Sequence, residues 1–440
     1  MKISVIGCGY LGAVHAVCMA ELGHEVVGVD VDPNKIAMLN RGEAPFFEPG
    51  LPELLEKLAD IRASGRLSFS TDISAARGAQ VHFVAVGTPQ KKGSNAADLT
   101  YVDAAVEALL PVLSAGDIVV GKSTVPVGTA ARLAQRVVEG APGAILAWNP
   151  EFLREGFALK DTLTPDRLVY GVPAGSDGDA AVAALDSVYS VALENDTPRI
   201  VTDYATAELV KVSANAFLAT KISFINAMAE VCEATGADVT QLADAIGHDV
   251  RIGRRFLNAG LGFGGGCLPK DIRAFMARAD ELGVDQALSF LSDVDAINLR
   301  RRTRMVELAR EVVGGDLTGK RIAVLGLAFK PNSDDVRDSP ALSVAAELAS
   351  SGAIVVATDP EAIETSRARN HDLHLVETVE EAAAGADAVL ILTEWQEYRD
   401  LDPETLGGIV GNRAILDGRN CLVPSQWRDA GWTYRALGRP

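Results

Sequence analysis

The stretch Lys2-Ile-Ser-Val-Ile-Gly7-Cys-Gly9-Tyr-Leu-Gly12, at the start of the 440-residue chain, decides its fold. Its first half is a short apolar run rich in β-branched residues, which predicts a buried strand. Three glycines follow in the pattern G-x-G-x-x-G, and the apolar residues 13–22 predict a helix that ends near Gly23. Glu25-Val-Val-Gly-Val-Asp30 predicts a second strand. Together these segments predict a β-α-β unit with parallel strands.

The same alternation continues along the chain. Residues 81–87 and 117–121 predict further buried strands with helical patterns between them. It then recurs in the second half, where residues 321–326, 354–359 and 383–393 resemble residues 2–7, 26–30 and 75–87. The fold class we predict is therefore α/β, with two Rossmann-like doubly wound domains. In the second copy Ala328 replaces a turn glycine, so we expect that domain to bind something other than a dinucleotide pyrophosphate.

The middle of the chain differs from both ends. Residues 206–235 form one continuous helical pattern without Gly or Pro, which ends at Gly236, a typical C-cap. A helix of this length can bridge two domains or pair with a copy of itself. Mostly helical sequence follows to about residue 313. We predict a first Rossmann-like domain over residues 1–200, a helical central and dimerisation domain over 201–300, and a second Rossmann-like domain over 301–440.

The composition narrows the possible partners. Lys and Arg number 41 against 59 Asp and Glu, a net charge of −18. Nucleic acid needs a basic surface, so we expect no nucleic-acid partner. Charges and glycines interrupt every apolar run before about 20 residues, so we expect no membrane partner. The five cysteines are too few for a disulfide framework, which is typical of a cytoplasmic protein. They include no C-x-x-C pair, so we expect no metal site.

The glycine pattern predicts a dinucleotide site. Gly7 permits the tight turn, Gly9 lets a pyrophosphate approach the backbone, and Gly12 lets helix and strand pack closely. The amides at the helix N-terminus would hold the phosphates. Asp30, at the end of the second strand, would accept hydrogen bonds from a ribose and repel a 2′-phosphate. NAD is thus favoured over NADP, and FAD is the remaining alternative.

A second segment of interest is Gly264-Gly-Gly-Cys267-Leu-Pro-Lys-Asp271. The glycines remove bulk around the thiol, and Pro269 predicts a helix start beside it, which favours a reactive thiolate. The alternative is a small packing cysteine in a glycine-rich loop. A nicotinamide site in the same chain favours catalysis, because a thiolate and NAD together can oxidise an aldehyde through a thiohemiacetal and a thioester.

Several further motifs are specific. They are E-P-G-L at 48–51, V-G-T-P at 86–89, K-S-T-V-P-V-G-T at 122–129, N-P-E-F-L-R-E-G at 149–156, K-V-S-A-N-A-F-L-A-T-K-I-S-F-I-N at 211–226, G-F-G-G-G-C-L-P-K-D at 262–271 and F-K-P-N-S-D-D-V-R-D-S-P at 329–340. With these motifs, residues 1–425 resemble the UDP-glucose/GDP-mannose dehydrogenase family. The resemblance implies that C6 of a nucleotide sugar is oxidised twice, from alcohol to acid, with two NAD reduced.

The resemblance also implies roles for individual residues. The catalytic set is Cys267 as nucleophile with Lys211, Asn215, Asp271, Thr124 and Glu151. The NAD-binding set is Gly7, Gly9, Tyr10, Leu11, Gly12, Asp30, Lys35, Thr88, Thr124, Glu155 and Arg337. The substrate-binding set is Glu151, Phe152, Leu153, Arg154, Glu155, Lys211, Asn215, Arg251 from a neighbouring subunit, Phe256, Leu257, Asn258, Ala259, Gly260, Gly264, Phe329, Lys330 and Arg419.

The substrate implied is UDP-glucose, and the family implies a homodimer or a higher homo-oligomer. GDP-mannose or a UDP-N-acetylhexosamine remains an alternative substrate for the same chemistry. A dehydrogenase that performs only one two-electron oxidation is a further alternative, as is a non-catalytic protein that binds NAD and a nucleotide sugar.

Overall fold

The computed structural model describes residues 1–369 and 372–440. Two compact units make up these residues. Unit 1 comprises Met1–Ala214 and Arg273–Gly283, and unit 2 comprises Asn215–Ile272 and Val284–Pro440. None of the helices in the described residues is long and apolar enough to cross a membrane.

Unit 1 is built on an eight-stranded sheet in the order β3-β2-β1-β4-β5-β6-β7-β8. The strands are β1 (Lys2–Ile6), β2 (Glu25–Val29), β3 (Leu67–Ser70), β4 (Val81–Val84), β5 (Ile118–Gly121), β6 (Ile145–Trp148), β7 (Leu168–Gly171) and β8 (Arg199–Thr202). The first six strands are parallel, in the strand order of dinucleotide-binding folds. The order reverses between β1 and β4, which is where such folds bind their ligands. β7 pairs antiparallel to β6, so β7 and β8 run opposite to the other strands.

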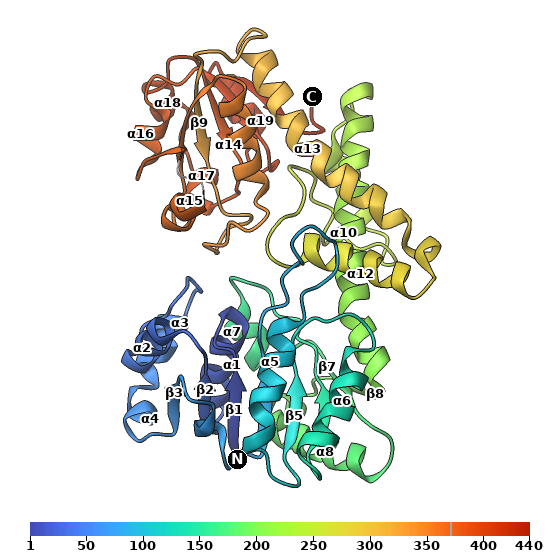
Figure 1. Ribbon diagram of the computed structural model, residues 1–440. Coiled ribbons are helices and arrows are strands. Elements are labelled where there is room, and N and C mark those ends of the chain that lie inside the picture. Colours follow the sequence, from blue (N-terminus) through green and yellow to red (C-terminus); the bar gives the residue numbers. More distant parts are fainter. Residues whose placement is uncertain (370–371) are drawn as a thin grey trace. The chain divides into compact units, whose positions relative to one another are not determined.

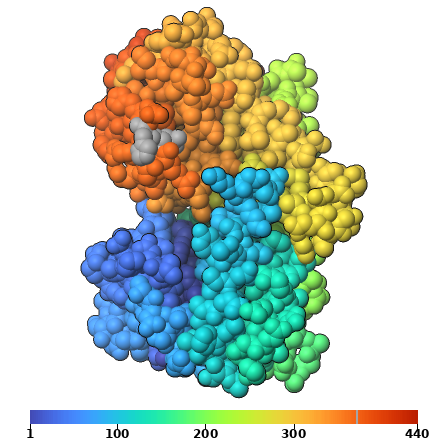
Figure 2. Space-filling view, viewed as in Figure 1, coloured from blue at the N-terminus to red at the C-terminus, as the bar shows by residue number. Residues whose placement is uncertain are grey.

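Helices cover both faces of this sheet (Figure 1). They are α1 (Tyr10–Glu21), α2 (Pro33–Arg41), α3 (Leu51–Lys57), α4 (Ala59–Ala63), α5 (Thr100–Leu109), α6 (Thr129–Gly140), α7 (Ala158–Leu163), α8 (Ser176–Val188) and α9 (Ser190–Glu194), with short 3-10 turns at Ile73–Ala76 and Leu110–Val112. Because central parallel strands are apolar on both sides, each face has its own buried cluster. Unit 1 also includes the larger part of helix α12 (Leu268–Glu281), and the loop 88–99 lies beside it (Figure 2). Both line a cavity of about 290 Å³.

Two long helices account for the predicted helical middle. Helix α10 (Tyr204–Thr235) ends at Gly236, whose φ of +75° is the expected left-handed cap. It is followed by α11 (Val239–Gly247), α12 (Leu268–Glu281), a 3-10 turn at Asp285–Leu288 and α13 (Phe290–Val312). The border between the two units falls inside α10. The two units do not correspond to the three predicted domains, because α10 contributes residues to both of them. The predicted domain boundaries at residues 200 and 300 therefore remain a prediction.

The described part of unit 2 contains a six-stranded parallel sheet in the order β11-β10-β9-β12-β13-β14. Its strands are β9 (Arg321–Leu325), β10 (Ile354–Thr358), β11 (His374–Leu375), β12 (Ala388–Ile391), β13 (Ala414–Asp417) and β14 (Thr433–Ala436). Its helices are α14 (Pro340–Ser350), α15 (Ile363–Arg369), α16 (Val379–Ala383), α17 (Gln396–Arg399), α18 (Pro403–Gly407) and α19 (Pro424–Asp429). This strand order is the same as that of the six parallel strands of unit 1, β3-β2-β1-β4-β5-β6. The predicted fold class, two Rossmann-like sheets joined by long helices, is therefore confirmed.

Candidate functional site

The glycine turn after β1 has the geometry that its spacing predicts. Gly7 has a φ of +91°, and its N–H donates to the carbonyl of Val29 at 2.7 Å. A Cβ on Gly12 would lie 1.7 Å from the oxygen of Gly7, so only glycine allows this packing, whereas a Cβ on Gly9 would meet open space. Helix α1 begins at Tyr10, which places Leu11 and Gly12 in its first turn. It starts earlier than Ala13, because the extended backbone ends at Gly9.

Asp30 stands next to this turn, at the end of β2. Its carboxylate accepts the N–H of Cys8 at 2.7 Å and that of Asp32 at 3.0 Å, and the Nζ of Lys35 lies 3.4 Å away. The N–H groups of α1 and an acceptor carboxylate at the end of the second strand fit a dinucleotide with a free ribose. Across the reversal of strand order, the hydroxyl of Thr88 donates to the carbonyl of Thr124 at 2.8 Å.

Glu48, in the E-P-G-L motif, is a residue for which we predicted no role. Its carboxylate is buried and accepts the N–H groups of Gly156 and Ala158, both at 2.7 Å, and the hydroxyl of Tyr10. This one carboxylate therefore links the glycine-rich helix to the segment 149–156. The E-P-G-L motif alone gave no signal for this contact, because the partners of Glu48 lie 38 to 110 positions away.

Glu151 and Lys211 come together in unit 1. The Nζ of Lys211 lies 3.9 Å from the Glu151 carboxylate and over the ring of Phe152 at 5.5 Å, and the N–H of Leu153 donates to Glu151 at 2.9 Å. Burial raises the pKa of Glu151, and the Lys211 charge opposes this effect. Arg154 instead pairs with Asp161 at 2.7 Å. Glu155 follows in the same loop, one residue before the Glu48 contact.

Glu208 is a second buried carboxylate that we did not predict. It accepts the N–H groups of Gly128 and Ala130, both at 2.7 Å, and so joins α10 to the start of α6, just after Thr124. Burial raises the pKa of Glu208 to about 7, although these two hydrogen bonds and the charge of Arg278 act in the other direction.

The pKa of Glu208 predicts a pH effect on stability. Between its ordinary value of 4.5 and about 7, the folded protein binds more protons than the unfolded chain. Its contribution to the free energy of unfolding therefore falls as the pH rises through this window, by up to about 3 kcal/mol. Glu208→Gln cannot ionise and should lack this fall, as urea unfolding at pH 5 and pH 7.5 will measure. Glu139→Gln, on the exposed face of α6, is the control; equal slopes in all three proteins would contradict the prediction.

In unit 2, Cys267 is exposed and immediately precedes α12, as predicted. The glycines before Cys267 make room for other atoms of the protein, not only for a ligand. A Cβ on Gly264 would lie 2.3 Å from the oxygen of Asp338, one on Gly265 would lie 2.7 Å from the ring of Phe329, and one on Gly266 would lie 2.2 Å from the Arg337 guanidinium. The glycines therefore let the loop 326–339 pack directly against the cysteine segment.

Asp271 and Asn215 meet in the same unit. The amide of Asn215 donates to the Asp271 carboxylate at 2.7 Å, and the Nζ of Lys270 donates to its other oxygen at 2.6 Å. Both Asp271 and Asn215 are buried. Arg337 forms a bidentate pair with Asp335, and the ammonium of Lys330 lies over the ring of Phe329.

The predicted sugar and uridine residues form two groups. Arg419 donates to the carbonyls of Gly262 and Phe329 at 3.0 and 3.1 Å, and so contacts the predicted residue Phe329. The segment 256–260 is fixed by other contacts: Gly260 donates to Asn226, Ala259 accepts from Asn420, Asn258 accepts from Arg254, Leu257 is buried, and Phe256 has a φ of +65°. Arg251 is exposed and pairs with Asp249 at 2.6 Å.

The second sheet has an aspartate where the first has Asp30, but its environment differs. Asp359 is fully buried and accepts the N–H groups of Leu327 and Ala328 at 2.7 and 3.0 Å, that of Ala362 at 2.8 Å, and the indole N–H of Trp395 at 3.1 Å. Protein donors occupy this carboxylate. It is therefore unsuited to a ribose, which agrees with the expectation that this sheet does not bind a dinucleotide.

The two sheets and the first glycine turn define a dinucleotide-binding α/β protein with a second, modified Rossmann-like domain. Its family follows from sequence comparison. Three domains of the UDP-glucose/GDP-mannose dehydrogenase family match the chain: the NAD binding domain at residues 1–192, the central domain at 205–300 and the UDP binding domain at 323–424. The chain belongs to this family.

Individual relatives match over the full length. A UDP-glucose 6-dehydrogenase of Rhizobium meliloti (strain 1021) is 44% identical over 443 residues, with 100% of both chains covered. The UDP-glucose 6-dehydrogenase TuaD of Bacillus subtilis (strain 168) is 42% identical, with 100% of this chain and 93% of the relative covered. The solved structure of a UDP-glucose dehydrogenase from Pyrobaculum islandicum has a TM-score of 0.90 at 40% identity, with 100% and 98% of the chains covered.

Proposed function

We propose that the protein oxidises UDP-glucose at C6 to UDP-glucuronate, with two NAD reduced and one water consumed. The observation that carries this proposal is the full-length similarity to UDP-glucose 6-dehydrogenases at 44% and 42% identity. The matches to an NAD binding domain and a UDP binding domain support it. NAD, when bound, accepts a hydride in each of the two oxidations.

The first oxidation needs the C6 hydroxyl to lose a proton. In our proposal Glu151 and Thr124 organise a water that takes this proton, and the ammonium of Lys211 stabilises the charge that develops on the oxygen. The ion pair between Lys211 and Glu151 supports these roles, because it keeps an acid and a base together in a buried place.

The second oxidation uses Cys267. Its thiolate adds to the aldehyde carbon and forms a thiohemiacetal, whose oxidation leaves a thioester. A water oriented by Asp271, with Asn215 as its partner, then hydrolyses the thioester and returns the thiolate. The hydrogen bonds of Asp271 to Asn215 and Lys270 support this role, because they keep the carboxylate in one orientation.

Binding roles follow the family pattern. For NAD we propose Gly7, Gly9, Tyr10, Leu11, Gly12, Asp30, Lys35, Thr88, Thr124, Glu155 and Arg337. For UDP-glucose we propose residues 151–155, Lys211, Asn215, Arg251 of a neighbouring subunit, residues 256–260, Gly264, Phe329, Lys330 and Arg419. We also propose a cytoplasmic location, which the presence of all five cysteines as thiols supports.

The test of this function is product stoichiometry over a panel of nucleotide sugars. UDP-glucose should yield two NADH and one UDP-glucuronate per molecule, measured by absorbance and mass spectrometry. Preferred turnover of GDP-mannose or a UDP-N-acetylhexosamine would overturn the substrate. One NADH per sugar would indicate a single two-electron oxidation, and binding without turnover would indicate a non-catalytic protein.

We propose a homodimer that forms through the part of α10 that belongs to unit 2. Phe217, Phe224 and Val231 are 67%, 48% and 53% exposed and recur every seven residues, so they form one apolar stripe along the helix. A second copy of the same stripe is its natural partner. Phe224→Glu should shift the dimer to monomer in sedimentation velocity, whereas Val138→Glu, at an isolated exposed valine of α6, should not. A dimer that survives both Phe217→Glu and Phe224→Glu would contradict this interface.

A further inference from the structure

A buried ammonium lies in unit 1, outside the residues assigned above. Lys122 follows β5 and is 7% exposed. Its Nζ donates to the side-chain oxygen of Asn149 at 3.0 Å and to the hydroxyl of Tyr189 at 3.2 Å, and it lies 5.7 Å from the ring centres of Phe83 and Tyr189. Both acceptors are neutral. Burial of a lysine is costly when its hydrogen-bond partners carry no charge, so another group must balance its charge.

The hydrogen bonds connect Lys122 to the segment that carries Glu151. Asn149 is two residues before Glu151, directly after β6. Its oxygen also accepts the Tyr189 hydroxyl at 2.7 Å, and its amide donates to the carbonyl of Val169 at 3.0 Å. With these contacts the Asn149 side chain has one orientation, and Lys122 is one of the groups that fix it. Lys122 thereby anchors the end of β6, from which the Glu151 loop departs.

The charges form a second connection. Burial raises the pKa of Glu151, and the charges of Lys211 and Lys122 together with the Leu153 N–H oppose it. Burial lowers the pKa of Lys122 to about 8, while Glu151 raises it and Lys211 lowers it further. One buried carboxylate thus interacts with two ammonium groups, one from the end of β5 and one from α10.

The other groups that face Lys122 do not carry charge near neutral pH. Burial, together with the charge of Lys122, holds the pKa of His15 on α1 well below its ordinary value, so this ring is neutral. Burial raises the pKa of Tyr189 well above its ordinary value, so its hydroxyl stays protonated. Phe83 of β4 and Asn149 do not titrate. Glu151 and Lys211 are therefore the charged groups with which Lys122 interacts.

We propose that Lys122 is a positioning residue of the dehydrogenase, which acts through Asn149 and Glu151. It anchors the strand end that carries Glu151, and with Lys211 it supplies the positive charge that keeps this buried carboxylate ionised. The proposal rests on the proposed function, in which Glu151 takes part in the first proton transfer. Without Lys122 the Glu151 carboxylate would hold its proton to higher pH.

The test is the pH dependence of kcat/KM for UDP-glucose in Lys122→Met, which has a similar length but no charge. The acid limb of the profile should move to higher pH by about one unit, so that the rate at the acid end falls about tenfold. The wild-type and variant profiles should converge above pH 8 to 9, where Lys122 itself loses its proton. A variant that only disturbs the packing should have a lower kcat/KM at every pH, so its profile should not converge with that of the wild type.

Three further variants keep the test decisive. Tyr189→Phe removes a hydrogen-bond acceptor but leaves the charge, so its acid limb should stay at the wild-type pH. Lys122→Arg should keep the limb in place as well. Lys122→Gln can still donate to Asn149, and it should show the shift if Lys122→Met fails to fold.

The outcomes separate the possibilities. A loss by the same factor at every pH in both neutral variants would overturn the proposal and leave Lys122 a packing residue. An unchanged profile would overturn it as well. If the wild-type protein itself does not turn over UDP-glucose, the proposed function fails and not the role of Lys122 within it.

Discussion

Replacement of Cys267 by serine is expected to lower the turnover of UDP-glucose by about a thousandfold or more. A serine hydroxyl is a far weaker acid than a thiol and does not supply the anion that adds to the aldehyde. Cys267 is exposed, precedes the 14-residue helix α12, and follows glycines without side chains. The positive end of a helix favours an anion at this position. The measurement is steady-state NADH production, with the thermal unfolding curve recorded to show that the variant is folded.

Cys421 is the matched control for this experiment. It is only partly exposed, and burial together with the charge of Asp417 raises the pKa of its thiol. Cys421→Ser should therefore retain wild-type turnover. In the unmodified protein, iodoacetamide should label Cys267 first and inactivate the enzyme, as peptide mass spectrometry will show. Full turnover by Cys267→Ser, or inactivation that follows the labelling of Cys421, would overturn the role of this thiol.

Local sequence patterns are sufficient to predict the central strands of both sheets and the glycine turn. An apolar run between turn residues predicts a buried strand. The glycine spacing predicts the conformation of the turn, because a side chain at Gly7 or Gly12 would collide with neighbouring atoms. The repeat of such runs in the second half predicts the second sheet. The reversed direction of β7 and β8 was not predictable in this way, because a strand pattern is the same in both directions.

Long-range polar contacts were beyond the reach of local patterns. Lys122 lies 27 and 67 positions from its partners Asn149 and Tyr189, and nothing in either segment alone indicates the contact. Asp30 and Asp359 are a sharper example, because they occupy equivalent positions after equivalent strands. Only the packed structure shows that the indole of Trp395 and four backbone N–H groups donate to the Asp359 carboxylate. The sequence predicts which positions carry a functional side chain. The hydrogen-bond partners of that side chain, which only the structure shows, determine whether it is available to a ligand.

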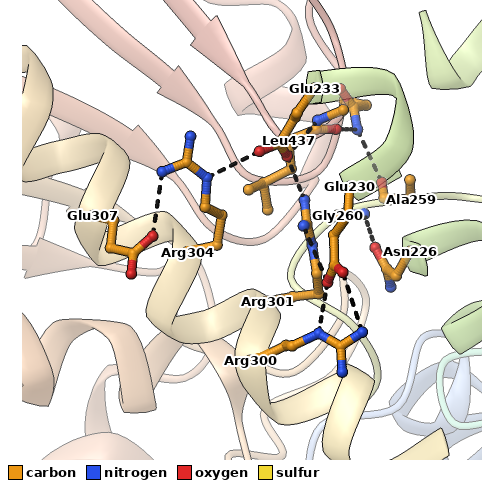
Figure 3. A network of polar contacts seen from close by, with 12 residues as sticks. Asn226, Glu230, Glu233, Ala259, Gly260, Arg300, Arg301, Arg304, Glu307 and Leu437 are labelled. Carbon is orange, nitrogen blue, oxygen red and sulfur yellow. Dashed lines mark hydrogen bonds and ion pairs between the residues drawn. The ribbon is translucent and has the colours of Figure 1, made fainter. Parts of the chain in front are cut away.

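The second large effect is expected on stability, at Glu233 in unit 2 (Figure 3). Its carboxylate accepts the Arg301 guanidinium at 2.7 Å, that of Arg304 at 2.9 Å and the N–H of Gly438 at 3.0 Å. Burial alone would raise the pKa of Glu233, but the hydrogen bonds from Arg301 and Arg304 hold it below its usual value. One side chain thus joins α10, α13 and the C-terminal tail.

Glu233→Ala should destabilise unit 2 by about 3 to 5 kcal/mol, because Arg301 is 1% exposed and would lose its closest carboxylate. The neighbouring Glu230 lies 3.6 Å from Arg301 and is already held by Arg300 at 2.8 Å, so it is a poor substitute. Glu307→Ala is the matched control. Glu307 is 51% exposed and accepts from Arg304 at 3.2 Å, so its loss should cost at most about 1 kcal/mol.

Urea unfolding followed by tryptophan fluorescence suits this comparison, because Trp395, Trp427 and Trp432 are buried in unit 2 and only Trp148 lies in unit 1. The signal therefore reports mainly on the unit that carries the mutation, even if the two units unfold separately. The contribution of Glu233 should also disappear in acid, since a carboxyl with a lowered pKa stabilises the fold above its unfolded value of 4.5 and ceases to do so as it gains a proton. Equal midpoints for Glu233→Ala and Glu307→Ala would mean that Glu230 replaces the lost partner and that the tail contact at Gly438 contributes little.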